Sequence, residues 1–199
     1  MKRLLVAGAA LAVLGFASPA AAVVWPGFGA DTLGPALIIT LNANGTASVS
    51  AGPGSAQGPY DSVEDTYIGV VNNFASTVNA ITISSPTAND VFGFDGDGID
   101  TFGAPGNASD SGGYGGPLGF FSNVTSAAGT DKGVVNFLGG LASGGNTYFS
   151  LEGPLTTSSF TGVTLGGVPE PASWALMILG VFSIGAGLRL RRREDTAPA

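Results

Sequence analysis

Glycine content is the feature of this sequence that most limits its fold. Glycine occupies 33 of the 199 positions and recurs throughout residues 23–168. Ser, Thr, Asn and Ala fill much of the remainder, whereas the long polar residues that favour helices are nearly absent there. Because glycine destabilises a helix interior and the polar helix formers are missing, we expect short strands and turns in this stretch.

Short apolar or alternating segments recur between the turn-rich segments. They are rich in Val, Ile, Thr, Phe and Tyr, which favour strands, and they are too short for helices. Several short strands separated by turns predict an all-β fold: a single antiparallel β-sandwich, jelly-roll-like, with a barrel as the alternative. The predicted strands span residues 36–41, 46–50, 65–71, 79–84, 91–94, 118–124, 133–138, 147–151 and 160–165.

Two turn-rich segments stand out between these strands. Asn44-Gly45 joins strands 36–41 and 46–50, and the pair supplies the positive-φ positions that a tight hairpin turn needs. Residues 104–116 consist mostly of Gly, Ser, Asn and Asp without apolar periodicity, which predicts a long loop. Tyr114, flanked by glycines in this loop, is expected to be exposed.

The first 22 residues predict export. Lys2 and Arg3 precede an apolar stretch, residues 4–16, and three alanines follow at 20–22. Positive charge, a short apolar helix and small side chains at the cleavage site are the requirements of a secretory signal, here cut after Ala22 by signal peptidase. An uncleaved membrane anchor is the alternative. The apolar stretch is too short to favour it.

The other end predicts a membrane helix. Residues 174–188 contain no charge, and at about 1.5 Å per residue they just cross a thin hydrocarbon core. Trp174 can lie at one interface. Because positive charge stays on the cytoplasmic side, Arg191, Arg192 and Arg193 place the preceding Pro-Glu-Pro on the outer side of that membrane.

This segment resembles the PEP-CTERM sorting signals, in the variant with Pro-Glu-Pro, two residues and Trp-Ala. The matching positions are Pro169, Glu170, Pro171, Trp174 and the arginines, Arg191 to Arg193. The resemblance implies an exosortase substrate that is held transiently in the inner membrane and then placed at the cell surface, outer membrane or extracellular matrix. Segments of this kind also have the label of the C-terminal region of ice-binding proteins, which is not evidence of ice binding.

Three patches of the middle region resemble the bodies of many PEP-CTERM proteins: residues 60–73, 92–99 and 144–152. The resemblance implies a shared β-fold in extracellular proteins of unassigned activity. The expected division is a signal peptide (1–22), a β-sandwich domain (23–165), a linker with the Pro-Glu-Pro motif (166–171), a transmembrane helix (172–190) and a basic cytoplasmic tail (191–199).

Charge and missing residue types exclude several functions. Residues 23–168 contain 11 acidic residues and one basic residue, Lys132, for a formal charge of −10. Such a surface repels nucleic acid and anionic lipid and favours divalent cations. Cysteine and histidine are absent, which excludes disulfides, imidazole-based metal sites and Ser-His or Cys-His nucleophiles.

Alternating aspartates predict a metal site. Asp95, Asp97 and Asp100 lie on a loop with glycines between them, so several carboxylates can turn toward one hard cation such as calcium. The loop does not fit the EF-hand pattern, and a solvated turn between strands is the alternative. Partner carboxylates are expected from Asp61 or from Glu64-Asp65 if those residues lie beside the loop.

These observations favour a non-enzymatic structural or adhesion protein of an exopolysaccharide or biofilm matrix. A calcium-dependent module that binds exopolysaccharide is the second hypothesis. A glycan-acting hydrolase is the third, because Glu64, Asp65 and Asp97 would suit glycoside hydrolysis if two carboxyl groups lay roughly 5–9.5 Å apart.

Overall fold

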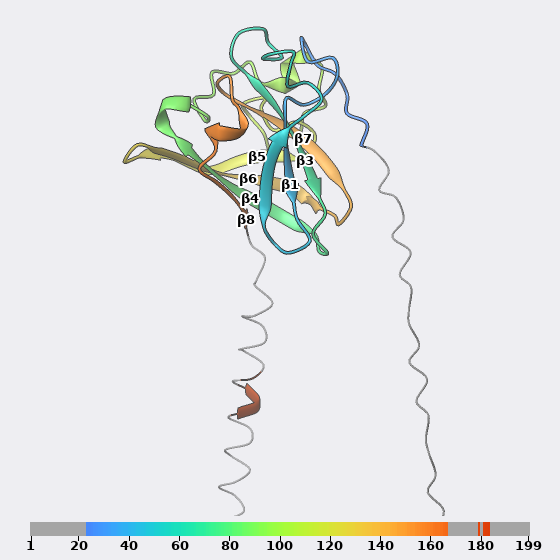
Figure 1. The fold of residues 1–199 in the computed structure, drawn as a ribbon, viewed down its shortest axis with the longest axis vertical. Coiled ribbons are helices and arrows are strands. Elements are labelled where there is room, and N and C mark those ends of the chain that lie inside the picture. The colour runs from blue at the N-terminus through green and yellow to red at the C-terminus, as the bar shows by residue number, and fades with distance from the viewer. Residues whose placement is uncertain (1–22, 167–178, 180, 184–199) are drawn as a thin grey trace, which may run out of the picture.

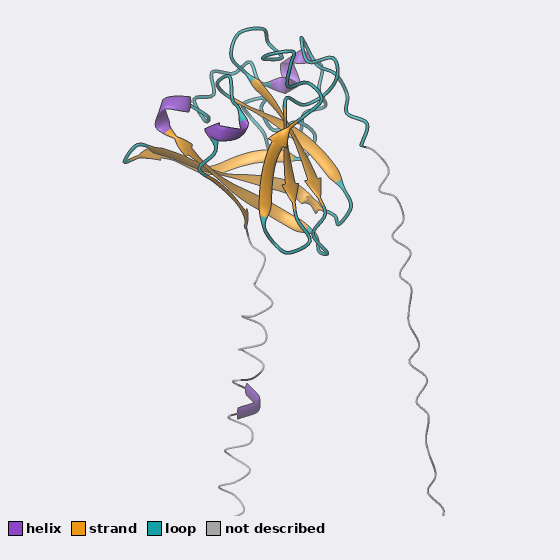
Figure 2. Ribbon diagram, viewed as in Figure 1, coloured by secondary structure: helices purple, strands orange, loops and turns teal. Residues whose placement is uncertain are grey.

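The computed structural model describes residues 23–166, Leu179 and residues 181–183. This part of the chain forms two four-stranded sheets joined by loops and three short 3-10 helices (Figures 1 and 2). The all-β prediction is therefore confirmed. Within these residues, no helix has the length and hydropathy needed to cross a membrane. The predicted segments 1–22 and 191–199, the Pro-Glu-Pro motif and most of the predicted helix 172–190 lie outside the described residues.

The two sheets contain strands from both halves of the domain. The 3-10 helices are η1 (Thr87–Asn89), η2 (Ile99–Phe102) and η3 (Thr157–Ser159). In spatial order, the first sheet consists of β2 (Ala47–Ala51), β1 (Leu37–Leu41), β3 (Thr66–Asn72) and β7 (Asn146–Leu151), and the second of β5 (Gly119–Ala127), β6 (Thr130–Leu141), β4 (Val78–Pro86) and β8 (Gly162–Gly166).

One pair of strands departs from the predicted antiparallel arrangement: β1 and β3 run parallel, with Leu37 opposite Ile68. All other neighbours in the two sheets are antiparallel. β2 ends beside the start of β1, because the two strands are antiparallel. The connection 52–65 therefore leads to a strand, β3, that begins at the same end as β1 and runs in the same direction. β1, β2 and β3 lie in the first sheet and β4, β5 and β6 in the second, so the chain alternates between the sheets only from β6 to β8, less often than in a jelly roll.

Eight of the nine predicted strands overlap an observed strand, and the ninth, 91–94, is wrong. Asp90 has a left-handed conformation (φ 46°), and Gly93 N–H donates to the Asp90 carbonyl at 3.1 Å, so the chain turns there. Val91 is completely buried, and Phe92 and Phe94 pack against the core. The apolar run is therefore a core contact made by a turn, which composition alone does not separate from a strand.

Residues of the strands form the larger of two buried apolar clusters, which lies between the sheets. In β1, Leu37, Ile39 and Leu41 are buried and the residues between them are half-buried. Burying a side chain of this size stabilises the fold by roughly 1.5–3 kcal/mol. The other strands contribute Ile68, Val70, Val78, Ile81, Ile83, Val135, Phe137, Leu141, Phe149 and Leu151.

Strand registers define the two ends of the sandwich. Because Thr66 at the start of β3 lies opposite Leu151 at the end of β7, their flanking residues meet at one end. Segments without strands, including 52–65 and 95–118, gather there. The β1–β2 turn lies at the opposite end, and Gly166, opposite Ala80 near the start of β4, ends β8 on that side (Figure 1).

The predicted β1–β2 hairpin is confirmed, but only one of its two turn residues has positive φ. Gly45 has φ 82°, whereas the Asn44 side chain accepts hydrogen bonds from the Thr46 N–H at 3.1 Å and the Thr46 hydroxyl at 2.7 Å. Glycine is needed at position 45 because an L side chain is disfavoured at this φ.

We expect Gly45→Ala to lower the free energy of unfolding by about 1 kcal/mol, because Ala is strained at positive φ. The space itself is open, since an added Cβ at Gly45 meets only Phe74 Cε2 at 3.8 Å. Gly162→Ala is the matched control: its φ is not in the left-handed region, and no atom lies within 4 Å of the added Cβ. Urea unfolding measures both, and an equal effect of the two changes would contradict the argument.

Candidate metal site

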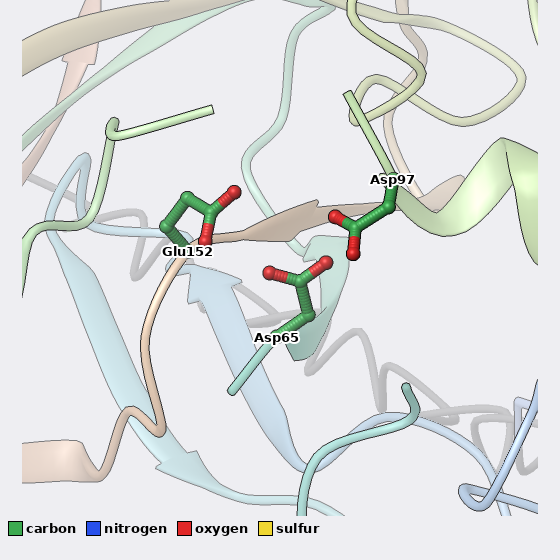
Figure 3. A group of neighbouring side chains, drawn as sticks. All are labelled: Asp65, Asp97 and Glu152. Atoms are coloured by element: carbon green, nitrogen blue, oxygen red, sulfur yellow. The ribbon is translucent and has the colours of Figure 1, made fainter. Parts of the chain in front are cut away.

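Three carboxylates converge at the loop end of the first sheet. One oxygen from each of Asp65, Asp97 and Glu152 lies within 4.8 Å of the other two (Figure 3). Asp65 directly precedes β3 and Glu152 directly follows β7, so the pairing of Thr66 with Leu151 places these two acids side by side. Asp97 comes from the segment that leads into η2.

Asp65 has an unsatisfied oxygen in this cluster. Its side chain is completely buried, and its Oδ2 accepts a hydrogen bond from the Tyr60 hydroxyl at 2.6 Å. Oδ1 is buried and has no hydrogen-bond partner among the described residues. Figure 3 shows the Asp65 carboxylate pointing toward Glu152 and Asp97. A buried carboxylate oxygen without a partner is costly, and it indicates a missing ligand or a bound proton.

Tyr114 brings a fourth oxygen into the cluster. Its hydroxyl lies 2.9 Å from Asp97 Oδ1 and 3.1 Å from Asp95 Oδ1, and it also hydrogen-bonds to Glu152 Oε1. One hydroxyl has one proton, so it cannot donate to three carboxylates at once. The remaining oxygen–oxygen contacts therefore require another positive charge or further protons.

The prediction that Tyr114 is exposed is wrong, because its side chain is completely buried. Its ring packs on Phe94 with centroids 4.4 Å apart, and its carbonyl accepts a hydrogen bond from Ser150 N–H at 2.7 Å. The polar loop folds back over the sheet end. Loop composition indicates where the chain lacks strands, but it does not show which of its side chains return to the core.

Burial and nearby negative charge raise the pKa values of two of these acids, whereas hydrogen bonds lower the pKa of a third. Burial raises the pKa of Asp65 to about 8; the Tyr60 hydrogen bond opposes this, and the charges of Glu152 and Asp97 add to it. The pKa of Asp95 is lowered by its contact with the Asp97 carboxyl and then by the Tyr114 hydroxyl. Glu64 is exposed, and its pKa is raised by partial desolvation and by Glu152 and Asp95. These shifts describe a locally negative site.

The described part of the chain offers no nearby counter-charge. Its one basic residue is Lys132 in β6 of the other sheet. Calcium takes six to eight oxygen ligands at about 2.3–2.6 Å, so ligands on opposite sides of the ion are about 4.6–5.2 Å apart. Oxygens within 4.8 Å of one another are compatible with one shared calcium ion. Asp65, Asp97 and Glu152 are the residues that would hold it.

The structure brings together only part of the predicted site. Of Asp95, Asp97 and Asp100, only Asp97 belongs to the cluster. Asp95 lies beside it through Tyr114, whereas Asp100 belongs to η2 and lies near Gly106.

Among the expected partners, Asp65 is in the cluster and Asp61 is not. Asp61 accepts hydrogen bonds from the N–H groups of Val63, Glu64 and Asp65, which gives it a role in the turn. Sequence reasoning missed Glu152. Its signal is its position directly after a strand, but only the β3–β7 pairing, which the sequence does not show, connects it to Asp65.

A second buried carboxylate lies outside the cluster. Asp31 is completely buried, and neither of its carboxylate oxygens has a hydrogen-bond partner among the described residues. Its backbone pairs with Phe28, which packs on Tyr67 and Tyr148. Burial raises the pKa of Asp31 to about 7, so the side chain is largely protonated in mildly acidic solution.

No family model, curated protein or solved structure matches the chain.

Asp31 should make the folded state less stable as the pH rises. Its pKa is raised from 3.8 to about 7, so between these values the folded state binds more protons than the unfolded state. The stability from this group is present below about pH 4 and is lost as the pH rises through about 7. Asp31→Asn should flatten the dependence over this range and raise the free energy of unfolding at pH 8. Denaturant unfolding from pH 4 to pH 8 measures this; an unchanged slope would contradict it.

Proposed function

We propose that this chain is an exported, non-enzymatic protein of the cell surface or extracellular matrix whose β-sandwich binds calcium through Asp65, Asp97 and Glu152. The observation that supports cation binding most is the buried, unpartnered Oδ1 of Asp65 beside two further carboxylates. The proposed role is structural or adhesive, in an exopolysaccharide or biofilm matrix.

The donor set supports calcium in particular. All its members are oxygens, which hard cations prefer, and the two buried carboxylates come from strand ends that are fixed by pairing. Asp97 is exposed, so an ion held here would keep a side open to water. Ions in extracellular modules typically bind with dissociation constants of about 10⁻⁴–10⁻³ M.

That open side favours calcium-dependent carbohydrate binding as the second candidate. An ion coordinated on its buried side by Asp65 and Glu152 would have coordination positions left on its exposed side for the hydroxyl groups of an exopolysaccharide. Hydrolysis is supported less, because a catalytic pair must reach a glycosidic bond. Asp65 is completely buried and Glu152 is 6% exposed, so neither is placed to contact a sugar.

The proposed location follows from the resemblance of the C-terminal segment to PEP-CTERM signals. In this proposal, signal peptidase removes residues 1–22, the apolar segment holds the protein in the inner membrane, and an exosortase-type enzyme acts at the Pro-Glu-Pro motif. The high acidity of residues 23–168 agrees with an extracellular protein that does not bind nucleic acid.

Calcium should raise the thermal stability of the purified full-length protein. A ligand that binds only the folded state stabilises it by RT ln(1 + [L]/Kd), which gives roughly 2 kcal/mol for 5 mM calcium and a Kd of about 0.1 mM. We expect the midpoint in calcium to exceed that in EDTA by several degrees, measured by circular dichroism. An unchanged midpoint would remove the calcium proposal.

Two variants separate ligation from general electrostatics. Asp97→Asn removes an exposed ligand and should abolish the calcium response without unfolding the protein. Glu64→Gln is the matched control: it removes one exposed charge that faces the same site but is not in the cluster, so most of the response should remain. If both variants lose the response equally, the ion is held by the diffuse charge alone.

The sorting proposal predicts a change in location. Replacing Pro169, Glu170 and Pro171 with alanine should leave the protein uncut in the inner-membrane fraction, because the motif for the processing enzyme is gone. Immunoblots of membrane, surface and medium fractions measure this. Asp195→Asn, in the tail beyond the arginines, is the control that should be sorted normally. Normal sorting of the alanine variant would refute the assignment.

A further inference from the structure

Residues 95–116, which we call the covering segment, have little regular structure, and many of them are exposed. The only helix or strand in them is η2. Ile99 and Tyr114 are nevertheless completely buried, and Ala104 is 8% exposed. The segment is attached to β7 by two hydrogen bonds: Ser150 N–H donates to the Tyr114 carbonyl at 2.7 Å, and Ile99 N–H donates to Ser150 Oγ at 3.1 Å.

The metal site lies between this segment and the strand ends. Asp97 belongs to the covering segment, whereas Asp65 and Glu152 are fixed at the ends of β3 and β7. Without an ion, the concentration of acidic groups at this point disfavours the closed position of the segment, and a proton on Asp65 relieves only part of this. With an ion, the same three groups are attracted to a common centre, so the sign of the force on the segment changes.

Tyr114 and Ile99 oppose opening, because it would expose buried apolar surface. The Tyr114 hydroxyl gives only part of the compensation, since its single proton cannot satisfy Asp95, Asp97 and Glu152 together. The closed position is therefore held by apolar contacts, by the two hydrogen bonds with Ser150, and by the Asp95 N–H and the Tyr114 hydroxyl, which both donate to Glu152 Oε1; the negative charge of the cluster opposes these contacts. Segments with this balance open locally more readily than strands do.

We propose that the bound cation holds the covering segment closed over the loop end of the first sheet, and that the ion-free protein opens this segment while both sheets stay folded. The inference rests on the proposed calcium site. Only the closed form brings Asp97 to Asp65 and Glu152, so only that form binds the ion tightly. Calcium thus shifts the population toward the closed form by mass action.

Limited digestion of the full-length protein with chymotrypsin tests this. The covering segment contains no Lys or Arg, and its aromatic residues are Phe102 and Tyr114. Cleavage after these two residues should be at least about 10-fold slower in 5 mM calcium than in EDTA, since a Kd near 0.1 mM lowers the open population roughly 50-fold. Phe74, in the β3–β4 turn at the opposite end, is the internal control and should be cut at the same rate in both.

Variants and a binding measurement separate the possible failures. Asp97→Asn should be cut after Phe102 and Tyr114 at the same rate with and without calcium, because the residue of the segment that would hold the ion is gone, whereas Glu64→Gln should keep the calcium-dependent protection. Calorimetric titration of the same protein with calcium chloride reports binding itself. If calcium binds but the cleavage rates do not change, the closing mechanism is refuted and the metal site stands. If calcium does not bind, both are refuted. If Phe74 is protected equally, calcium stabilises the whole domain and the local opening is refuted.

Discussion

The main physical constraint on the loop end of this protein is the close approach of acidic side chains that the fold brings together. Asp65 and Glu152 are both buried, and Asp97 completes the group from a segment far away in the sequence. Their neighbourhood contains two more acids, Asp95 and Glu64, which are exposed, and among the described residues it contains no basic side chain. An arrangement of this kind costs stability unless an ion or a proton balances the charge. Folded domains keep such groups at positions where ions, substrates or protons bind, because burying unpaired charge is otherwise disfavoured.

The domain can stay folded despite this loss of stability because apolar burial and strand pairing stabilise the rest of it. A continuous apolar core lies between the sheets, and each buried strand has a neighbour on at least one side. The pairing of β3 with β7 is the most relevant part, since the same ladder that packs Ile68 beside Phe149 also fixes the carboxylates one residue beyond its end. The positions of Asp65 and Glu152 are thus a consequence of strand register, whereas Asp97 reaches them from the covering segment.

The sequence predicted those features that depend on local residue preferences alone. Alternation of apolar residues located most strands, and Asn44-Gly45 located the hairpin. The segment 91–94 was mistaken for a strand because Val91 and Phe92 are buried from a turn, and apolar composition is the same in both cases. The aspartates of the loop were predicted to be metal ligands, but only Asp97 lies in the cluster. Choosing Glu152 over Asp100 requires knowledge of which strands pair, which depends on contacts between residues about 85 positions apart.

The end at which the chain leaves the domain determines how the metal site would be displayed. Gly166 ends β8 on the side of the β1–β2 turn, whereas Asp65 and Glu152 lie at the other end of the first sheet. A strand of seven residues such as β3 extends about 23 Å. A protein tethered through its C-terminal continuation would therefore hold the acidic cluster at its tip, at least one strand length away from the point of attachment. In that geometry the proposed attachment and the proposed ion would lie at opposite ends of the sandwich, so cleavage of the tail would leave the acidic cluster undisturbed.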